Sequence, residues 1–129
     1  MSGIKNLSEA TNIKGKSVVI TGSTSGIGLG LARAFAAEGA RIMINGFGDR
    51  DEIERIRQDL SDTSGAQAHY SGADMSKPSE IAAMMGQAEN TFGGVDILVN
   101  NAGIQYVSAI DEFPDAKWEA IIAINLSSA

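Results

Sequence analysis

Residues 17–28 read Ser-Val-Val-Ile-Thr-Gly-Ser-Thr-Ser-Gly-Ile-Gly, an apolar run that leads into a glycine-rich loop. The run at residues 17–21 has glycine on both sides and predicts a strand that is buried on both faces. From Gly26 the apolar residues recur at the spacing of one helical face, and Gly39 is expected to close that helix. A buried strand, a glycine loop and a helix in this order predict the start of a βαβ unit.

The alternation of strands and helices continues along the chain. Three further apolar runs predict strands, at residues 41–45, 66–72 and 95–99. The helices between them each have one apolar face, and the second of these helices is expected to have Pro78 in its first turn. A last helix is expected to begin near Asp115, with one side formed by Trp118, Ile121, Ile122, Asn125 and Leu126.

Strands that are separated by helices require right-handed crossovers and a parallel sheet covered on both faces. The sequence therefore predicts an α/β fold, a Rossmann-type doubly wound parallel sheet in three α/β/α layers. The fold is expected to be truncated after the fourth strand and the following helix, because that helix has no terminating glycine or proline. Residues 1–129 would then be the N-terminal part of a single domain, with residues 1–13 as a polar lead-in and strand 95–99 at or near an edge.

Composition excludes several classes of function. Ten Lys and Arg against sixteen Asp and Glu give a net charge of -6, which argues against nucleic acid or an anionic membrane as partner. With no cysteine and one histidine, the chain offers no thiolate or His-rich metal site, and no metal is expected. The N-terminal residues are polar and no apolar run is long enough to span a membrane, so the sequence predicts a cytoplasmic protein.

The glycine loop predicts a ligand that carries a diphosphate. Gly22 allows a sharp turn at the end of the strand, and glycine at the helix start lets a pyrophosphate approach backbone N–H groups at the positive end of the helix. The alternative is a tight turn without a ligand. The spacing G-x-x-x-G-x-G lacks the Gly-Lys-Ser/Thr ending of a P-loop, which argues against ATP or GTP hydrolysis.

Three motifs together resemble the short-chain dehydrogenase/reductase family. They are Thr21-Gly-x-x-x-Gly-x-Gly28, Ala73-Asp74-Met75 after the third strand, and Asn100-Asn101-Ala102-Gly103 after the fourth. All three follow strands, at the edge where ligands bind in open α/β sheets. Taken singly, the Asp could be an ordinary carboxylate at a helix start and the asparagines a polar turn.

The resemblance implies a dinucleotide cofactor and assigns residues to it. The pyrophosphate and the neighbouring ribose would contact the glycine loop at Gly22, Thr24, Ser25, Gly26, Ile27 and Gly28. Beside Ala73, Asp74 would accept a hydrogen bond from the adenine amino group and Met75 would donate one from its backbone. The residues expected on the adenosine-ribose side are Asn101, Ala102 and Gly103.

The segment after the second strand, Asn45-Gly-Phe-Gly-Asp49, favours NAD as the cofactor. The 2′-phosphate of NADP needs a cation, and neither Gly46 nor Ser25 supplies one. The common NAD pattern closes this strand with an acidic residue, whose place Gly46 takes here. Arg50 is the residue that could reverse the choice.

Within the family, the segments around Phe47 and Gln105 look most like members that oxidise 3-hydroxybutyrate. The resemblance places Phe47 near the adenine ribose and Gln105 on the substrate carboxylate. The alternatives are a loop aromatic that covers the core and an ordinary polar loop residue. An assembly of identical subunits, a tetramer, is implied for the complete protein.

The catalytic Tyr-x-x-x-Lys pair of the family is missing, because neither Tyr70 nor Tyr106 has a lysine four residues later. One catalytic residue would be present, since an asparagine at the position of Asn125 orders a water that leads to the catalytic lysine in the family. A satisfied core asparagine is the alternative. The complete enzyme would interconvert 3-hydroxybutyrate and acetoacetate by hydride transfer, and this chain alone is expected to be inactive. An NADP-linked 3-oxoacyl reductase and a non-catalytic nucleotide-binding fragment remain open.

Overall fold

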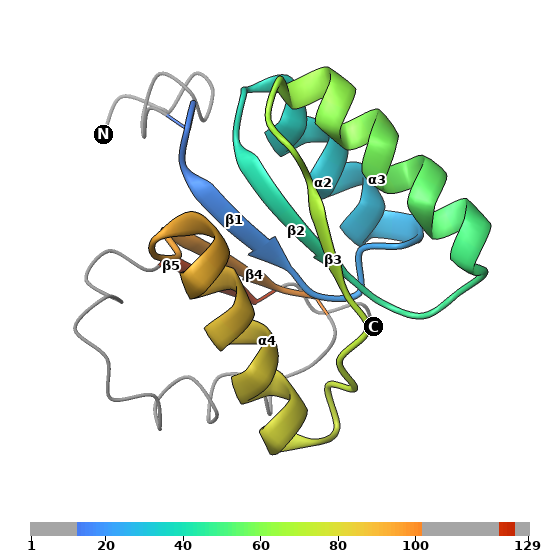
Figure 1. Cartoon of the computed structure of the whole chain (residues 1–129), viewed down its shortest axis with the longest axis vertical. Helices are drawn as coiled ribbons and strands as arrows, with labels where there is room; N and C mark the ends of the chain where they lie inside the picture. Colours follow the sequence, from blue (N-terminus) through green and yellow to red (C-terminus); the bar gives the residue numbers. More distant parts are fainter. Residues whose placement is uncertain (1–12, 102–121, 126–129) are drawn as a thin grey trace.

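The computed structural model describes residues 13–101 and, as backbone, residues 122–125 (Figure 1). These residues form a parallel sheet with helices on both sides. The elements in chain order are β1 (Ser17–Ile20), α2 (Gly26–Ala37), β2 (Arg41–Asn45), α3 (Arg50–Ser64), β3 (His69–Ser71), α4 (Pro78–Phe92), β4 (Ile97–Asn100) and β5 (Ile122–Asn125). Within these ranges no helix has both the length and the apolar character that a membrane crossing requires.

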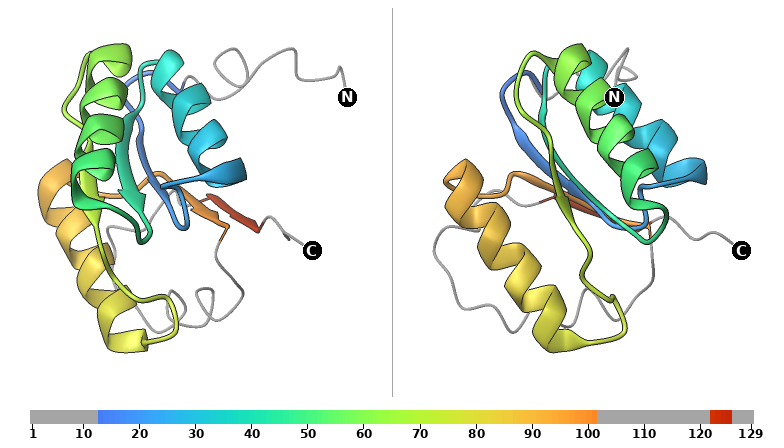
Figure 2. Two further views of the ribbon diagram at one scale, coloured as in Figure 1. Left: turned by 90° about the vertical axis from the view of Figure 1, so that its right-hand side faces the viewer. Right: turned by 45° about the vertical axis from the view of Figure 1, so that its right-hand side comes forward.

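The described strands lie in the order β3-β2-β1-β4-β5, and every neighbouring pair is parallel. The chain runs outward from β1 through β2 to β3 and then returns to place β4 on the other side of β1. This reversal puts α2 and α3 on one face and α4 on the other, as Figure 2 shows. The predicted α/β fold, a doubly wound parallel sheet in three layers, is confirmed.

Two apolar clusters fill the spaces between the sheet and the helices. In β1, Val18 and Ile20 belong to the cluster under α2 and α3, whereas Val19 belongs to the cluster under α4. A strand with helices on both faces needs apolar side chains in both directions, which explains the uninterrupted apolar runs in the sequence. The helices contribute one apolar face each: Ile53, Ile56 and Leu60 from α3, and Ile81, Met84, Met85, Ala88 and Phe92 from α4.

The structure corrects the prediction for the last described segment. Residues 122–125, expected on a helix that begins near Asp115, form strand β5 instead, while residues 115–121 lie outside the described part. β5 pairs with β4 from Ile97↔Ile122 to Asn100↔Asn125. This pairing satisfies backbone groups that would otherwise stay open along β4, and it outweighs the helical spacing of a short run rich in β-branched isoleucine. The apolar strand predicted at 95–99 is therefore an interior strand.

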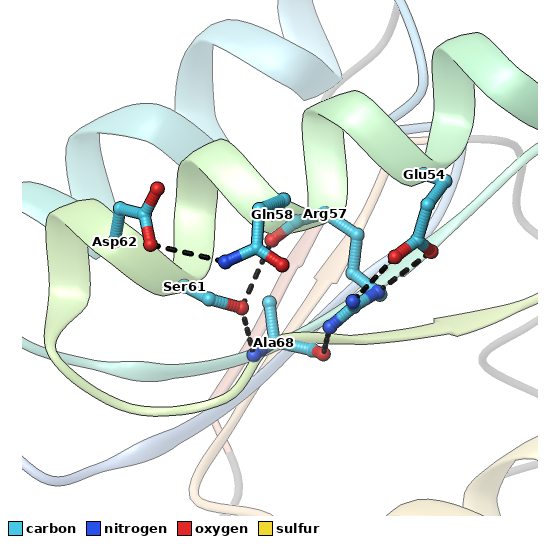
Figure 3. Close-up of polar contacts among 6 residues, drawn as sticks. All are labelled: Glu54, Arg57, Gln58, Ser61, Asp62 and Ala68. Atoms are coloured by element: carbon cyan, nitrogen blue, oxygen red, sulfur yellow. Dashed lines mark hydrogen bonds and ion pairs between the residues drawn. The ribbon is translucent and has the colours of Figure 1, made fainter.

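The third strand is shorter than predicted, because side chains of α3 form hydrogen bonds with the backbone groups of the residue just before it. The Ala68 N–H donates to Ser61 Oγ at 2.8 Å, and Arg57 Nη1 donates to the Ala68 carbonyl oxygen at 2.9 Å (Figure 3). Arg57 is itself oriented by two hydrogen bonds to the Glu54 carboxylate. These contacts fasten α3 to the chain leading into β3, which begins only at His69.

Arg41 and Phe92 tie the sheet to α4 at the edge where the strands begin. The Arg41 guanidinium lies 5.3 Å from the centre of the Phe92 ring and donates to the carbonyl oxygens of Phe92 and Gly15. The His69 ring meets the same Phe92 ring edge-on, with the ring centres 5.6 Å apart. Burial lowers the pKa of His69, and the positive charge of Arg57 lowers it further.

We expect His69 to make the stability of the protein depend on pH. Its pKa is lowered by folding, so the unfolded chain, where the value is about 6.5, binds the proton more tightly. The free energy of unfolding should therefore fall as the pH is lowered through about 6.5, and His69→Gln should lose that part of the slope. Urea unfolding of both proteins at about pH 7.5 and about pH 5.5 measures the difference. An identical pH dependence in the two proteins would contradict the assignment.

Candidate functional site

Polar and glycine-rich loops gather where the parallel strands end. The loops after β1, β2, β3 and β4 all leave the same edge of the sheet, because the strands point the same way. β1 lies between β2 and β4 at the point where the chain reverses its direction of winding, which is where open α/β sheets bind ligands. The predicted residues on this edge that the structure describes are Gly22, Thr24, Ser25, Gly26, Ile27, Gly28, Phe47, Ala73, Asp74, Met75 and Asn101.

The glycine loop brings the start of α2 into close contact with the end of β1. Gly22 and Gly26 both have φ of 60°, a left-handed conformation that glycine adopts without strain. A side chain at Gly28 would collide with the carbonyl oxygen of Gly22 and would lie 2.8 Å from Asn101 Nδ2. The helix therefore approaches the turn at a distance that only glycine permits.

Among the described residues, no side chain neutralises the first turn of α2. Ser25, the N-cap residue, is extended and accepts no capping hydrogen bond, and the first turn carries no acidic residue. At the start of α3, by contrast, the Asp49 carboxylate accepts a hydrogen bond from the Glu52 N–H at 3.0 Å. The free N–H groups and positive dipole end of α2 are thus available to an external anion. A Cβ built at Gly26 meets nothing within 4 Å, so this turn is open to a ligand.

Asn101 lies against the same loop and retains an unused acceptor. Its backbone N–H donates to Thr21 Oγ1 at 2.9 Å, and its Nδ2 donates to the Gly22 carbonyl oxygen at 3.0 Å. Its Oδ1 is buried and has no hydrogen-bond partner among the described residues. A buried acceptor without a donor is unfavourable by about 1–3 kcal/mol, which a hydroxyl group of a bound sugar would relieve.

The loop after β2 explains why glycine stands where an acidic residue is common. At Gly46 a Cβ would lie 2.5 Å from Thr24 Oγ1, and φ is 150°. Thr24 Oγ1 donates to the Phe47 carbonyl oxygen at 3.0 Å, and the Tyr70 hydroxyl donates to the Gly46 carbonyl oxygen at 2.5 Å. The side chain of Phe47 is 69% exposed and that of Ile27 is 62% exposed. These two large apolar side chains are exposed at the site, one on the loop after β2 and one in the first turn of α2.

The loop after β3 presents an ionised carboxylate. Asp74 Oδ1 accepts hydrogen bonds from the Ser76 N–H at 2.9 Å and from the Ser76 hydroxyl at 2.7 Å, and these bonds lower the pKa of Asp74. Both use the same oxygen, so the second oxygen is available to a donor. The Asp74 N–H donates to Glu80 Oε1 at 2.8 Å, which holds the loop against the first turn of α4.

Sequence reasoning missed Asn45, which links the loops. It closes β2 with its side chain 1% exposed and hydrogen-bonds to Gly22, Ser71 and Ala73. The signal in the sequence is an asparagine at the end of an otherwise apolar strand, since a buried amide needs partners. Tyr70, which supports the loop after β2, was likewise not assigned to the site.

Several predicted residues cannot be placed in the site. Ala102, Gly103 and Gln105 lie outside the described residues. Asn125 ends β5 with its backbone opposite Asn100, at the same edge as the loops, and is not on the helix that its predicted role assumed. That catalytic role stays a prediction.

The described residues fit a ligand with a diphosphate and a sugar. They offer free N–H groups at a helix start, an unpaired buried acceptor in Asn101, an ionised Asp74 and two exposed apolar side chains. A dinucleotide has a group for each of these features. The site can therefore bind and orient such a cofactor.

Two curated proteins similar to this chain are bacterial dehydrogenases. A D-beta-hydroxybutyrate dehydrogenase of Cupriavidus necator is 57% identical over 121 residues, which are 91% of this chain and 45% of that protein. One of Rhizobium meliloti is 54% identical over 88% of this chain and 44% of its own length. The chain thus spans less than half the length of these relatives.

Solved structures share the fold. L-sorbose reductase from Gluconobacter frateurii, complexed with NADPH and L-sorbose, has a TM-score of 0.65 and 40% identity over 71% of this chain and 35% of its own. An NADH-dependent reductase, A1-R′, complexed with NAD, has a TM-score of 0.65 and 33% identity over 72% of this chain and 38% of its own. The family model "short chain dehydrogenase" matches residues 16–129. Since this match covers most of the chain, the protein belongs to the short-chain dehydrogenase family.

Proposed function

We propose that this chain is the N-terminal, cofactor-binding part of an NAD-dependent dehydrogenase that interconverts 3-hydroxybutyrate and acetoacetate. The observation that carries the proposal is the uncapped start of α2, which lies so close to Gly22 at the end of β1 that residue 28 has no room for a side chain. Family membership and the two similar hydroxybutyrate dehydrogenases support the reaction and the substrate. When bound, the nicotinamide ring accepts or returns the hydride.

Each loop of the site has a separate task in this proposal. The N–H groups of the first turn of α2, with Thr24 and Ser25, bind the diphosphate. Asn101 Oδ1 accepts a hydrogen bond from the adenosine ribose. The free oxygen of Asp74 accepts one from the adenine amino group, and the Met75 N–H donates to the ring. Asp74 is ionised in the neutral range, as an ordinary aspartate is, and the hydrogen bonds from Ser76, which lower its pKa, keep this acceptor charged to more acidic pH as well.

The charges around the loop after β2 favour NAD over NADP. Gly46 and Phe47 provide no cation for a 2′-phosphate, and α3 begins with Asp51 and Glu52 in its first turn. Arg50 lines a hollow of about 440 Å³ together with Asp51, Ile53, Glu54 and Tyr70. Asp51 offsets the positive charge of Arg50 in this hollow, and Glu54 is paired with Arg57, so no excess positive charge is left to attract a second phosphate.

The remaining parts of the proposal rest on the family resemblance. The substrate is a small hydroxy acid whose carboxylate contacts Gln105, and Asn125 serves the proton path of the complete enzyme. The complete protein assembles into a homotetramer in the cytoplasm.

Gly28→Ala should weaken NADH binding in the full-length protein that carries this chain. The added methyl group would overlap the Gly22 carbonyl oxygen and push α2 away from the loop. We expect the dissociation constant to rise by at least about tenfold, or about 1.4 kcal/mol. Isothermal calorimetry measures it.

Gly30→Ala is the matched control for this variant. It lies in the same helix, and a Cβ there meets nothing within 4 Å. Alanine is the better helix former by about 1 kcal/mol, so this variant should be at least as stable as the wild type and bind NADH normally. Equal affinities of the two variants would refute the assignment of the loop.

Phe47→Arg should shift the cofactor preference toward NADP. Arginine cannot be tested at Gly46, where a side chain would collide with Thr24, but Phe47 is exposed. A charge-assisted pair with the 2′-phosphate contributes about 1.5–3 kcal/mol, so the ratio of kcat/KM for NADP to that for NAD should rise at least about tenfold. Phe47→Leu, which removes the ring without adding a charge, should leave the ratio unchanged. If Phe47→Arg also leaves it unchanged, another residue governs the choice.

Residues 1–129 alone should not catalyse the reaction. Neither tyrosine is followed by the lysine of the catalytic pair, and the Tyr70 hydroxyl donates to Gly46. The loss of an acid–base group lowers the rate by about 10²–10⁴-fold. An absorbance assay for NADH with 3-hydroxybutyrate compares this chain with the full-length protein at equal concentration. Reduction of NAD by the chain alone would contradict the prediction.

A further inference from the structure

We propose that Asn45 is a positioning residue that holds two loops at a set separation. One is the glycine loop at residues 21–28, here called the diphosphate loop, and the other is the loop after β3 with Ala73 and Asp74, here called the adenine loop. The inference rests on the proposed function, because it assumes that both loops bind one dinucleotide. In the proposed function, Asn45 contacts neither the diphosphate nor the adenine of the cofactor directly. Its effect would be exerted through the backbone groups of Gly22 and Ala73.

The Asn45 side chain is buried and all of its polar partners belong to the backbone. Oδ1 accepts a hydrogen bond from the Gly22 N–H at 3.1 Å. Nδ2 donates to the carbonyl oxygens of Ser71 and Ala73, both at 3.0 Å. An N–H group cannot accept and a carbonyl cannot donate, so the orientation of the amide follows from its neighbours.

The backbone of Asn45 binds the same loop. Its N–H donates to Ser23 Oγ at 2.9 Å, and its carbonyl oxygen accepts from the Ser23 N–H at 2.6 Å. The paired register of β1 and β2 ends one residue earlier, at Ile20↔Ile44. Asn45 therefore extends the contact between these strands beyond the sheet and into the glycine loop.

The two loops that Asn45 joins would bind opposite ends of the ADP part of the dinucleotide, the diphosphate at one end and the adenine at the other. Gly22 opens the loop that leads to the first turn of α2, and Ala73 directly precedes Asp74. The pairing of β2 with β3 ends at Asn45↔Ser71, so the bond to Ala73 lies beyond the sheet. A shift of either loop relative to the other would break a hydrogen bond to the same buried amide.

Of the side chains similar in size to Asn45, an amide alone meets these requirements. Aspartate would keep an acceptor for the Gly22 N–H but would place a negative charge against two carbonyl oxygens. Alanine would remove the side-chain partner of three backbone groups, one buried and two partly buried, which is unfavourable. A neutral side chain also keeps negative charge away from the loop that would hold a diphosphate.

The test compares Asn45→Ala and Asn45→Asp with the wild type in the full-length protein. Asn90→Asp, which changes an exposed residue of α4 by the same charge, is the control. For both Asn45 variants we expect the dissociation constant for NADH and the KM for NAD to rise about tenfold. At saturating NAD, kcat should stay at the wild-type value, since the loss is one of cofactor binding. Thermal unfolding shows which variants are folded.

A double-mutant cycle with Asp74→Asn separates positioning from a general loss of stability. If Asn45 holds the adenine loop in place, Asp74→Asn should weaken NADH binding less in the Asn45→Ala protein than in the wild type. Additive effects, or an unchanged NADH affinity in a folded Asn45 variant, would overturn the inference. So would failure of both variants to fold, because Asn45 would then belong to the fold alone. If the wild type itself does not bind NADH, it is the proposed function that fails.

Discussion

The contact between Gly28 and the carbonyl oxygen of Gly22 is the constraint on which the site depends. Because residue 28 has no side chain, the first turn of α2 can lie directly over the end of β1. The peptide groups of Gly22 are then held from both sides: Asn45 accepts from its N–H, and Asn101 donates to its carbonyl oxygen. Two asparagines, one at the end of β2 and one directly after β4, thus fix the conformation of the loop.

The fold could be predicted wherever burial leaves a local pattern. β1, β2 and β4 lie between two layers of helices and have apolar side chains on both faces, and α3 and α4 have one apolar face each. The prediction failed at β5, where a run of four residues has no period of its own and the partner strand decides its conformation. It also overextended β3, because the contacts of Arg57 and Ser61 with Ala68 involve residues in different elements.

In the site, too, residues in local sequence motifs could be predicted, whereas residues that act through distant contacts could not. The glycines and Asp74 could be singled out because they belong to short motifs that are contiguous in the chain, and their binding roles stay predictions. Asn45 and Tyr70 were missed because their hydrogen bonds reach residues 23 to 28 positions away, and no local spacing encodes such a contact. For the same reason the sequence could not explain why residue 46 is glycine, because the side chain that excludes a Cβ there belongs to Thr24 on another loop.

The uncapped start of α2 also limits how the protein can be stabilised. Without a ligand, the N–H groups of this turn lack the partner that a capping side chain supplies in most helices, so the free protein gives up stability at this point. In the proposed function, a bound dinucleotide would return that stability through linkage, by an amount that rises with the logarithm of its concentration. A substitution that introduces an acidic residue into this turn would make the empty protein more heat-resistant and would at the same time compete with the cofactor. Thermal tolerance and cofactor affinity are therefore opposed at this helix end, and an engineer who selects for one would lose the other.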